Sequence, residues 1–166
     1  MASGRGKTRT VQAELGEEAF ARELEARLGT YVKQAEQALM AAKSAALRPF
    51  ELTVPQYSTL MTVKFLPGQS ATQLARISHV TQQTMASTLA TLEARGLIER
   101  RTSPLHAKVK TVHLTAAGAD LVTAADEHAH AIETRLANAF TPAERDTFRE
   151  LTTRAIDHLR AELREL

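Results

Sequence analysis

Apolar residues recur at every third or fourth position through most of this chain, and that spacing places them on one face of an α-helix. In the first helical stretch Gly29 favours a break or bend, because glycine destabilises a helix interior by about 1 kcal/mol relative to alanine. Residues 108–114 instead alternate polar and apolar side chains, which is the period of a half-buried strand. The chain therefore predicts a mostly α fold with a small β-hairpin. The expected helices span about residues 13–47, 53–65, 70–77, 81–95, 115–136 and 141–166, and the hairpin strands span residues 97–101 and 108–114.

The predicted helix starts carry capping residues. Thr53 is followed three positions later by Gln56, and Ser70 by Gln73, which is the spacing of a capping box. Thr141 begins the run Thr-Pro-Ala-Glu, which adds a proline in the first turn to the same spacing. Single threonine caps are expected at Thr81 and Thr115.

Residues 70–115 combine a short helix, a tight turn at Ser78 and His79, a second helix that ends at Arg95-Gly96, and the hairpin. This order is that of a winged helix-turn-helix, in which the second helix enters the major groove of DNA and the hairpin is the wing. The residues expected to face inward are Leu74, Ala75, Ile77, Val80, Met85, Leu89 and Leu92.

The helices on either side of this DNA-binding segment, which spans about residues 53–115, carry apolar stripes longer than the segment can cover. They pack within one chain or across a dimer, and we favour a homodimer, because DNA operators are read as paired half-sites. We expect residues 13–166 to form one domain, with dimerisation helices at about 13–48 and 116–166. Residues 1–12 are small, polar and basic, and we expect them to be a disordered tail.

Composition excludes several classes of function. The chain has no cysteine, which excludes disulfides, thiolate metal sites and cysteine redox sensing. No apolar run approaches the roughly 18 residues needed to span a bilayer, and the basic N-terminus is not followed by the apolar segment of a secretory signal. We expect a cytoplasmic protein without a membrane partner.

The net charge of +2 is unevenly distributed along the chain. Residues 66–115 contain six basic and two acidic side chains, whereas residues 116–166 contain six basic and ten acidic side chains. Residues 1–10 add Arg5, Lys7 and Arg9 with no acid. An excess of positive charge on the expected DNA-binding segment and on a terminal tail favours nucleic acid as the partner.

The predicted recognition helix at 81–95 begins with side chains that carry amides and hydroxyls but no charge. An ordinary solvated helix face is rich in Glu and Lys, whereas glutamine pairs with adenine N6 and N7, and hydroxyls and methyls suit several bases. We interpret this face as reading bases; a merely polar surface is the alternative. Candidate DNA contacts on this helix and the preceding one are Ser70, Thr72, Gln73, Thr81, Gln82, Gln83, Thr84, Ser87 and Thr88.

The wing supplies the remaining candidate DNA contacts, which are Arg100, Arg101, His106, Lys108 and Lys110. The basic side chains suit phosphates, and Lys108 near the tip suits the minor groove. The alternative is a solubilising edge on a two-stranded ribbon.

These features together resemble the MarR family of bacterial transcriptional regulators over roughly residues 20–160. The resemblance implies a dimer with a winged helix-turn-helix in each subunit, which usually represses transcription at a near-palindrome and often responds to a small phenolic effector. The family's recognition helix often carries a basic residue where this chain has Ser87, and its wing usually carries Asp-Arg-Arg where this chain has His106, Ala107 and Lys108. The matching residues are Leu52-Thr53, Gln56-Tyr57, Leu74-Ala75, Val80-Thr81, Gln83-Thr84, Leu92-Glu93, Gly96 to Arg101, Leu114-Thr115 and Gly118.

By resemblance, an effector pocket lies between the dimer helices and the DNA-binding segment, with Tyr31, Tyr57, Met61 and Phe65 as candidate lining residues; ordinary core residues are the alternative. The absence of cysteine excludes the peroxide-sensing branch of the family. Activation and repression are not distinguished by the sequence.

No metal site, cofactor or catalytic residue is predicted. His128 and His130 are two residues apart, so on a helix they point in different directions and do not share an ion. No nucleophile elbow, phosphate loop or zinc-hydrolase motif is present, which argues against an enzyme. The competing function is a winged helix that binds another protein and has no specific DNA target.

Overall fold

The computed structural model describes residues 17, 19–102 and 109–165 of the chain. Two compact units divide it between Ala42 and Lys43. The first unit is helical over residues 19–25 and again in α2 (Leu28–Leu47), which continues into the second unit. The break at residues 26–27 confirms the interruption predicted near Gly29. Hydrogen bonds from Arg27 N to Leu24 O and from Thr30 N to Arg27 O tighten the chain there.

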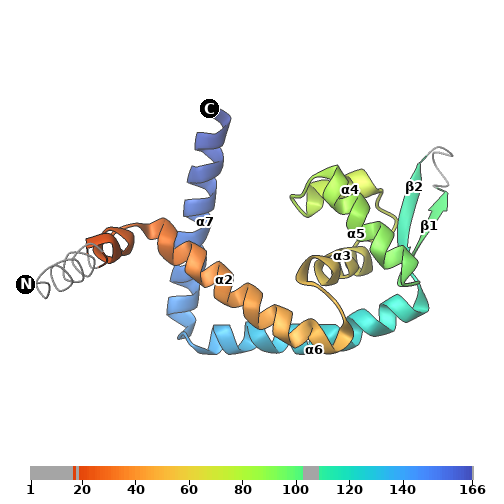
Figure 1. The fold of residues 1–166 in the computed structure, drawn as a ribbon, viewed down its shortest axis with the longest axis horizontal. Helices are drawn as coiled ribbons and strands as arrows, with labels where there is room; N and C mark the ends of the chain where they lie inside the picture. The colour runs from red at the N-terminus through yellow and green to blue at the C-terminus, as the bar shows by residue number, and fades with distance from the viewer. Residues whose placement is uncertain (1–16, 18, 103–108, 166) are drawn as a thin grey trace, which may run out of the picture. The chain divides into compact units, whose positions relative to one another are not determined.

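The second unit contains the expected order of short helices, hairpin and long helices (Figure 1). A turn of 3₁₀-helix, η1 (Arg48–Phe50), joins α2 to α3 and contains Pro49. The expected mostly α fold with one small β-hairpin is confirmed. The other elements are α3 (Val54–Phe65), α4 (Ala71–Ile77), α5 (Gln82–Ala94), β1 (Ile98–Thr102), β2 (Lys110–Leu114), α6 (Ala116–Asn138) and α7 (Pro142–Glu165).

The predicted helix caps are confirmed in atomic detail. Thr53 and Ser70 both form complete capping boxes with the glutamine three residues on. The side chains of Thr81 and Thr115 accept hydrogen bonds from Thr84 N and Gly118 N. Each cap satisfies backbone N–H groups that have no partner inside the helix, so the helices start where the local sequence directs.

The hairpin pairs β1 with β2 in antiparallel register, with Ile98 opposite Leu114 and Arg100 opposite Val112. The other edge of β2 pairs with residues 68–70: Gly68 N donates to Val112 O, Val112 N donates to Gln69 O, and Ser70 bridges Thr111. Gly68 has a φ of 81°, a left-handed conformation that favours glycine. This third edge segment, absent from the sequence-based prediction, attaches the start of α4 to the hairpin.

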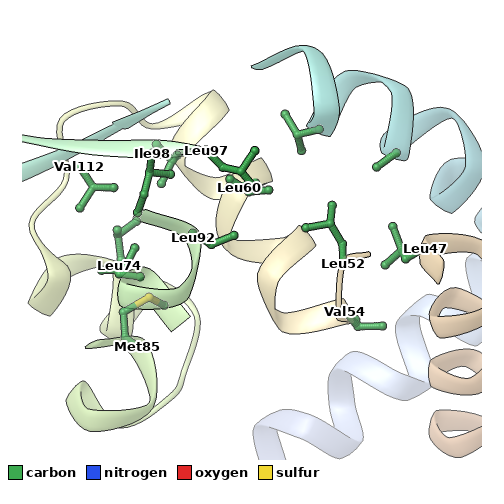
Figure 2. Packing of buried hydrophobic residues seen from close by; sticks show 14 of the residues in the cluster. Leu47, Leu52, Val54, Leu60, Leu74, Met85, Leu92, Leu97, Ile98 and Val112 are labelled. Atoms are coloured by element: carbon green, nitrogen blue, oxygen red, sulfur yellow. The ribbon is translucent and has the colours of Figure 1, made fainter. Parts of the chain in front are cut away.

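One hydrophobic core joins α3, α4, α5, the hairpin and α6. Figure 2 shows Leu74, Met85 and Leu92 pointing into a shared interior with Ile98 and Val112. The predicted inward positions Leu74, Ala75, Met85, Leu89 and Leu92 are confirmed as buried.

Two predicted core positions were wrong. Ile77 and Val80, expected inside, are each 39% exposed. They flank the turn between α4 and α5, where the chain reverses, and the described part of the chain leaves them exposed. Helical periodicity identifies the inward face of a helix, but it does not indicate whether neighbouring elements extend over the helix end.

Gly118 marks the closest approach between α6 and the hairpin. A Cβ atom at this position would lie 1.9 Å from the carbonyl oxygen of Leu97. Thr115 N donates to that same oxygen, and Thr115 Oγ1 donates to Gly96 O at 2.7 Å. The start of α6 is therefore held directly against the end of α5 and the start of β1.

The last helix, α7, is amphipathic but carries its apolar side chains on the surface of the single chain. None of its residues is buried. Within residues 17, 19–102 and 109–165, no helix combines the length and apolar character needed to cross a membrane. The exposed large apolar residues of α7 are Phe148, Leu151, Ile156, Leu159 and Leu163.

Candidate DNA-binding interface

The turn between α4 and α5 sets the direction of the predicted recognition helix. His79 closes α4 in a left-handed conformation with φ 52°, and Val80 N then donates to Ala75 O at 3.0 Å. Thr81 is extended and caps α5. The first turn of α5 therefore follows a short, hydrogen-bonded reversal of the chain.

The outward face of α5 is uncharged. Met85, Leu89 and Leu92 are buried on the opposite side. All but one of the predicted base-reading side chains of this helix are exposed, and Thr88 is half-buried. The exposed ones are Thr81, Gln82, Gln83, Thr84 and Ser87.

Of the three candidate DNA contacts at the start of α4, two have side chains that are hydrogen-bonded in the helix cap. Ser70 N and Ser70 Oγ both donate to Gln73 Oε1, and Gln73 N donates to Ser70 Oγ, so both side chains are used in the capping box. Thr72 lies exposed between them. A DNA contact from Ser70 or Gln73 stays a prediction, and it would have to share these groups with the cap.

Two of the basic wing residues already have acidic partners. Arg100 Nε lies 3.1 Å from Glu93 Oε2, and Arg101 Nη2 lies 2.5 Å from Glu99 Oε1. These pairs are substantially exposed, and exposed pairs contribute only about 0–1 kcal/mol. Exchange of the carboxylate for a DNA phosphate therefore costs little. Both acidic side chains of the segment 66–115 are used in these pairs.

Of the other three candidate wing residues, the structure describes only Lys110. Lys110 is exposed, and its Nζ donates to Thr102 Oγ1 at 2.8 Å. His106 and Lys108 lie outside the described residues, as does the loop around them. Their predicted contacts, including the minor-groove contact of Lys108, stay predictions.

Arg95 has a role that sequence reasoning missed. The sequence indicates only that Arg95 adds positive charge and stands at the end of the recognition helix, but its Nη1 donates to Glu51 O at 2.7 Å and its Nη2 donates to Phe50 O at 3.2 Å. The end of α5 is thereby tied to the connection between α2 and α3. No local pattern indicates this tie, because the partners are 44 and 45 residues apart.

The four candidate effector residues do not share one environment. Tyr57 and Met61 pack against the core of the second unit, whereas Phe65, on the same helix, is 70% exposed. Tyr31 belongs to the first unit and is 53% exposed. Phe65 and Tyr31 are therefore not ordinary core residues of the single chain.

Tyr57 links α3 to α6 through its hydroxyl, which donates to Asp126 Oδ1 at 2.5 Å. Burial, together with the hydrogen bond to Asp126 and the negative charges of Asp126 and Glu133, raises the pKa of the Tyr57 phenol above its usual range. The phenol is therefore a neutral donor at physiological pH. Lys64 adds a second link between the same helices, because its Nζ donates to Thr123 Oγ1 at 3.0 Å.

Among the described residues, no group of three or more His, Asp or Glu side chains is arranged to hold a metal ion. His128 instead lies edge-on to Phe50, with ring centroids 5.0 Å apart, and His113 Nε2 lies 3.0 Å from Thr111 Oγ1. The described histidines therefore suggest no ion-binding geometry.

Comparison with known proteins identifies the class to which this geometry belongs. A MarR family model matches residues 50–108, which span η1 to the wing. The HTH-type transcriptional repressor Rv2887 of Mycobacterium tuberculosis is 32% identical over 108 residues, which are 65% of this chain and 78% of that protein. The chain belongs to the MarR family. The transcriptional regulator HosA of Escherichia coli is 27% identical over 107 residues, covering 64% of this chain and 79% of HosA.

Solved structures of MarR proteins share this fold. The repressor CouR bound to a 23-mer DNA duplex superposes with a TM-score of 0.75 at 25% identity, over 81% of this chain and 95% of CouR. Rv2887 in complex with salicylic acid gives a TM-score of 0.61 at 29% identity, over 78% of this chain and 96% of that one. The MepR–DNA complex of Staphylococcus aureus, at 21% identity and a TM-score of 0.76, supports the fold alone. The resemblance inferred from the sequence is confirmed: this is a MarR-family transcriptional regulator.

Proposed function

We propose that this MarR-family regulator represses transcription by binding a near-palindromic DNA operator as a homodimer, with α5 in the major groove and the wing on the adjacent backbone. The observation that carries the proposal is the exposed, uncharged, amide- and hydroxyl-bearing face of α5 beside a cationic hairpin. That combination separates base reading from phosphate binding, as sequence-specific DNA recognition requires. The family relatives that are repressors support the negative sign of regulation.

The homodimer is supported by the apolar surface of α7. Phe148, Leu151 and Leu159 are 53%, 48% and 63% exposed in the single chain. Contiguous exposed apolar surface of this kind marks an interface. A second copy with the same helix provides a self-complementary partner and places two α5 helices on one duplex.

We further propose that a small aromatic molecule relieves repression. One relative, Rv2887, solved in complex with salicylic acid and with p-aminosalicylic acid, supports this chemistry. Tyr57, Met61 and Phe65 of α3 are the proposed lining residues, and Tyr31, in the other compact unit, stays a candidate from the family resemblance alone. Neither this binding nor the DNA binding requires a catalytic residue, and we propose a cytoplasmic, non-enzymatic protein.

The test is DNA binding by the purified full chain, measured by fluorescence anisotropy between 50 and 200 mM salt, where a protein with several phosphate contacts loses about 10³-fold or more in affinity. The DNA is the region upstream of its own gene, with a scrambled duplex as competitor. We expect tighter binding to the native sequence and a steep salt dependence. Weak binding that is equal for both duplexes, together with no enrichment of any sequence from a random pool, would overturn the proposal in favour of a protein-binding winged helix.

A further inference from the structure

The chemistry of the outward face of α5 restricts which bases it reads. Resting on the proposed DNA-binding function, we propose that α5 reads A·T base pairs, with Gln82 and Gln83 as adenine contacts and side-chain methyl groups as thymine contacts, and that it makes no major-groove contact to guanine. The proposal concerns α5 alone, and phosphate and minor-groove contacts by the wing are separate.

The first argument is the absence of a guanine-reading group. The commonest specific contact to guanine is a bidentate arginine or lysine on O6 and N7. From Thr81 to Ala94 the helix has no basic residue. The next residue, Arg95, has both terminal nitrogens on the carbonyls of Glu51 and Phe50 at 2.7 and 3.2 Å. Its guanidinium is therefore held against η1 and is not available to a base.

The second argument concerns the threonines. Thr88 Oγ1 donates to Thr84 O at 3.0 Å, and Thr91 Oγ1 donates to Ser87 O at 3.1 Å. The hydroxyls of Thr81 and Thr84 are hydrogen-bonded to each other at 2.8 Å. Because Thr88 and Thr91 use their hydroxyl protons within the helix, their methyl groups and an accepting oxygen are what these two side chains offer to a partner. The C5-methyl group of thymine is the apolar feature of the major groove that methyl groups contact.

The third argument is geometry around the helix. Gln83, Ala86, Ser87 and Ala90 are separated by three or four residues, so they share one face, and all are exposed. Met85 and Leu89 are buried on the other side. The face opposite the core thus contains an amide, a hydroxyl and two methyl groups. A glutamine amide donates and accepts at once, which matches adenine N6 and N7.

The amides are free to make this contact. Within the described residues, the side-chain amides of Gln82 and Gln83 make no hydrogen bond, whereas those of Gln56 and Gln73 are used in capping boxes. Gln82 and Gln83 are also exposed. They are therefore the side chains of the α4–α5 unit that combine an unused amide with a position in the first turn of the recognition helix.

The experiment begins with in vitro selection from random duplexes using the full chain, followed by base-analogue substitution in the selected site. We expect the α5-contacted positions to be A·T pairs. Replacing adenine there with its N7-deaza analogue should weaken binding about tenfold per contacted site, and replacing thymine with uracil should weaken it about threefold, in line with the loss of one base contact or one buried methyl group. The N7-deaza analogue of guanine should have no effect at any position that α5 contacts.

Variants assign the contact to residues. In each of the variants Gln82→Ala and Gln83→Ala, the adenine analogue should cause no further loss of affinity at the one adenine that the replaced glutamine contacts. The amide that binds N7 of that adenine is already missing. Gln37→Ala, an exposed glutamine on α2, is the matched control and should retain the full effect. Both glutamines of interest lie on the surface, so folding is preserved.

The outcomes separate this inference from the function on which it rests. Selection that returns no preferred sequence would remove the proposed DNA function itself. A preferred sequence whose binding is abolished by the guanine analogue at positions that α5 contacts, or is insensitive to the adenine analogue, would leave a DNA-binding regulator but overturn the assignment of α5 to A·T pairs.

Discussion

At the scale of single residues, Tyr57 and Gly118 show how one atom decides the packing of α6. The Tyr57 hydroxyl gives Asp126 a hydrogen-bond partner across the α3–α6 contact. Near the start of α6, Gly118 has no side chain, which permits the helix to approach the Leu97 carbonyl closely. Both positions fix how α6, which leads from the hairpin to α7, packs on the elements before it.

Tyr57→Phe should lower the free energy of unfolding by about 1–2 kcal/mol at pH 7, because Asp126 loses its donor while it is half-buried. The unfolded chain loses the phenolic proton near pH 10, whereas the folded chain keeps it to higher pH, since folding raises the pKa of Tyr57. The stability advantage of the wild type over Tyr57→Phe should therefore be constant up to about pH 9 and decline as the pH rises past about 10.

Urea unfolding at several pH values measures this difference. Tyr31→Phe is the control, because Tyr31 is exposed and its hydroxyl makes no hydrogen bond within the described residues. An advantage that grows above pH 10 would contradict the assigned hydrogen bond.

Gly118→Ala should destabilise the protein by about 1–3 kcal/mol, because its Cβ would lie 1.9 Å from a backbone oxygen that has little freedom to move. Gly29→Ala, near the start of α2 with no atom within 4 Å of the added Cβ, is the matched control and should be neutral or stabilising by up to about 1 kcal/mol. Thermal unfolding of the two variants tests the contrast. Equal effects would mean that α6 does not approach the hairpin this closely.

At the scale of elements, the interface separates two tasks. The helix α5 carries the uncharged face, and the hairpin carries cations that are held by nearby acids. Arg100 and Arg101 belong to β1, whose partner β2 is held on both edges by β1 and residues 68–70. A wing attached on both sides presents its cations from a defined position, which favours phosphate contact over a merely solubilising edge.

Glu99→Gln should strengthen binding to operator and unrelated DNA alike by a few-fold, because Arg101 loses its competing carboxylate and a negative charge leaves the wing. Arg101→Gln should weaken both and reduce the slope of log affinity against log salt by about one. Anisotropy titrations across a salt series measure both variants. The control is Glu23→Gln, which breaks a similar exposed pair with Arg27 at 2.9 Å in the other compact unit. Loss confined to one DNA sequence would indicate base reading by Arg101.

At the scale of the whole molecule, the last helix stacks Phe148 on Phe140 but leaves the rest of its apolar stripe exposed on the single chain. Leu159 and Leu163 are 63% and 72% exposed. Burying such side chains yields about 1.5–3 kcal/mol each, so a dimer that covers this stripe gains substantially. Dimerisation also links two recognition helices, so its loss lowers operator affinity even when each α5 is intact.

Leu159→Glu should convert the dimer into a monomer and weaken operator binding far more than non-specific binding, because a charge would be buried in the proposed interface. Sedimentation velocity measures the assembly state. Thr153→Glu, exposed on a different face of α7, is the control that adds the same charge. A Leu159→Glu protein that remains dimeric would show that α7 does not form the interface.

The sequence by itself determined the helix starts, the helix-turn-helix order and the uncharged face of α5. Capping boxes such as Thr53 with Gln56 and turns such as Ser78-His79 join residues within a few positions of each other, so they form wherever the local sequence provides them. The inward face of α5 followed from periodicity for the same reason. The MarR resemblance rested on these local features in order, and it included Gly118 without revealing why a glycine stands there.

Only the tertiary structure decided which side chains are exposed and which already contact distant parts of the chain. The exposure of Ile77 and Val80, the pairing of residues 68–70 with β2, the contact at Gly118 and the tie from Arg95 to η1 depend on elements brought together from distant positions. The Tyr57–Asp126 hydrogen bond spans 69 residues of sequence. Such contacts depend on how the packed elements meet and not on the conformational preferences of neighbouring residues. Charge and periodicity therefore identify the candidate DNA-contact residues, and the fold determines which of their side chains remain free to bind DNA.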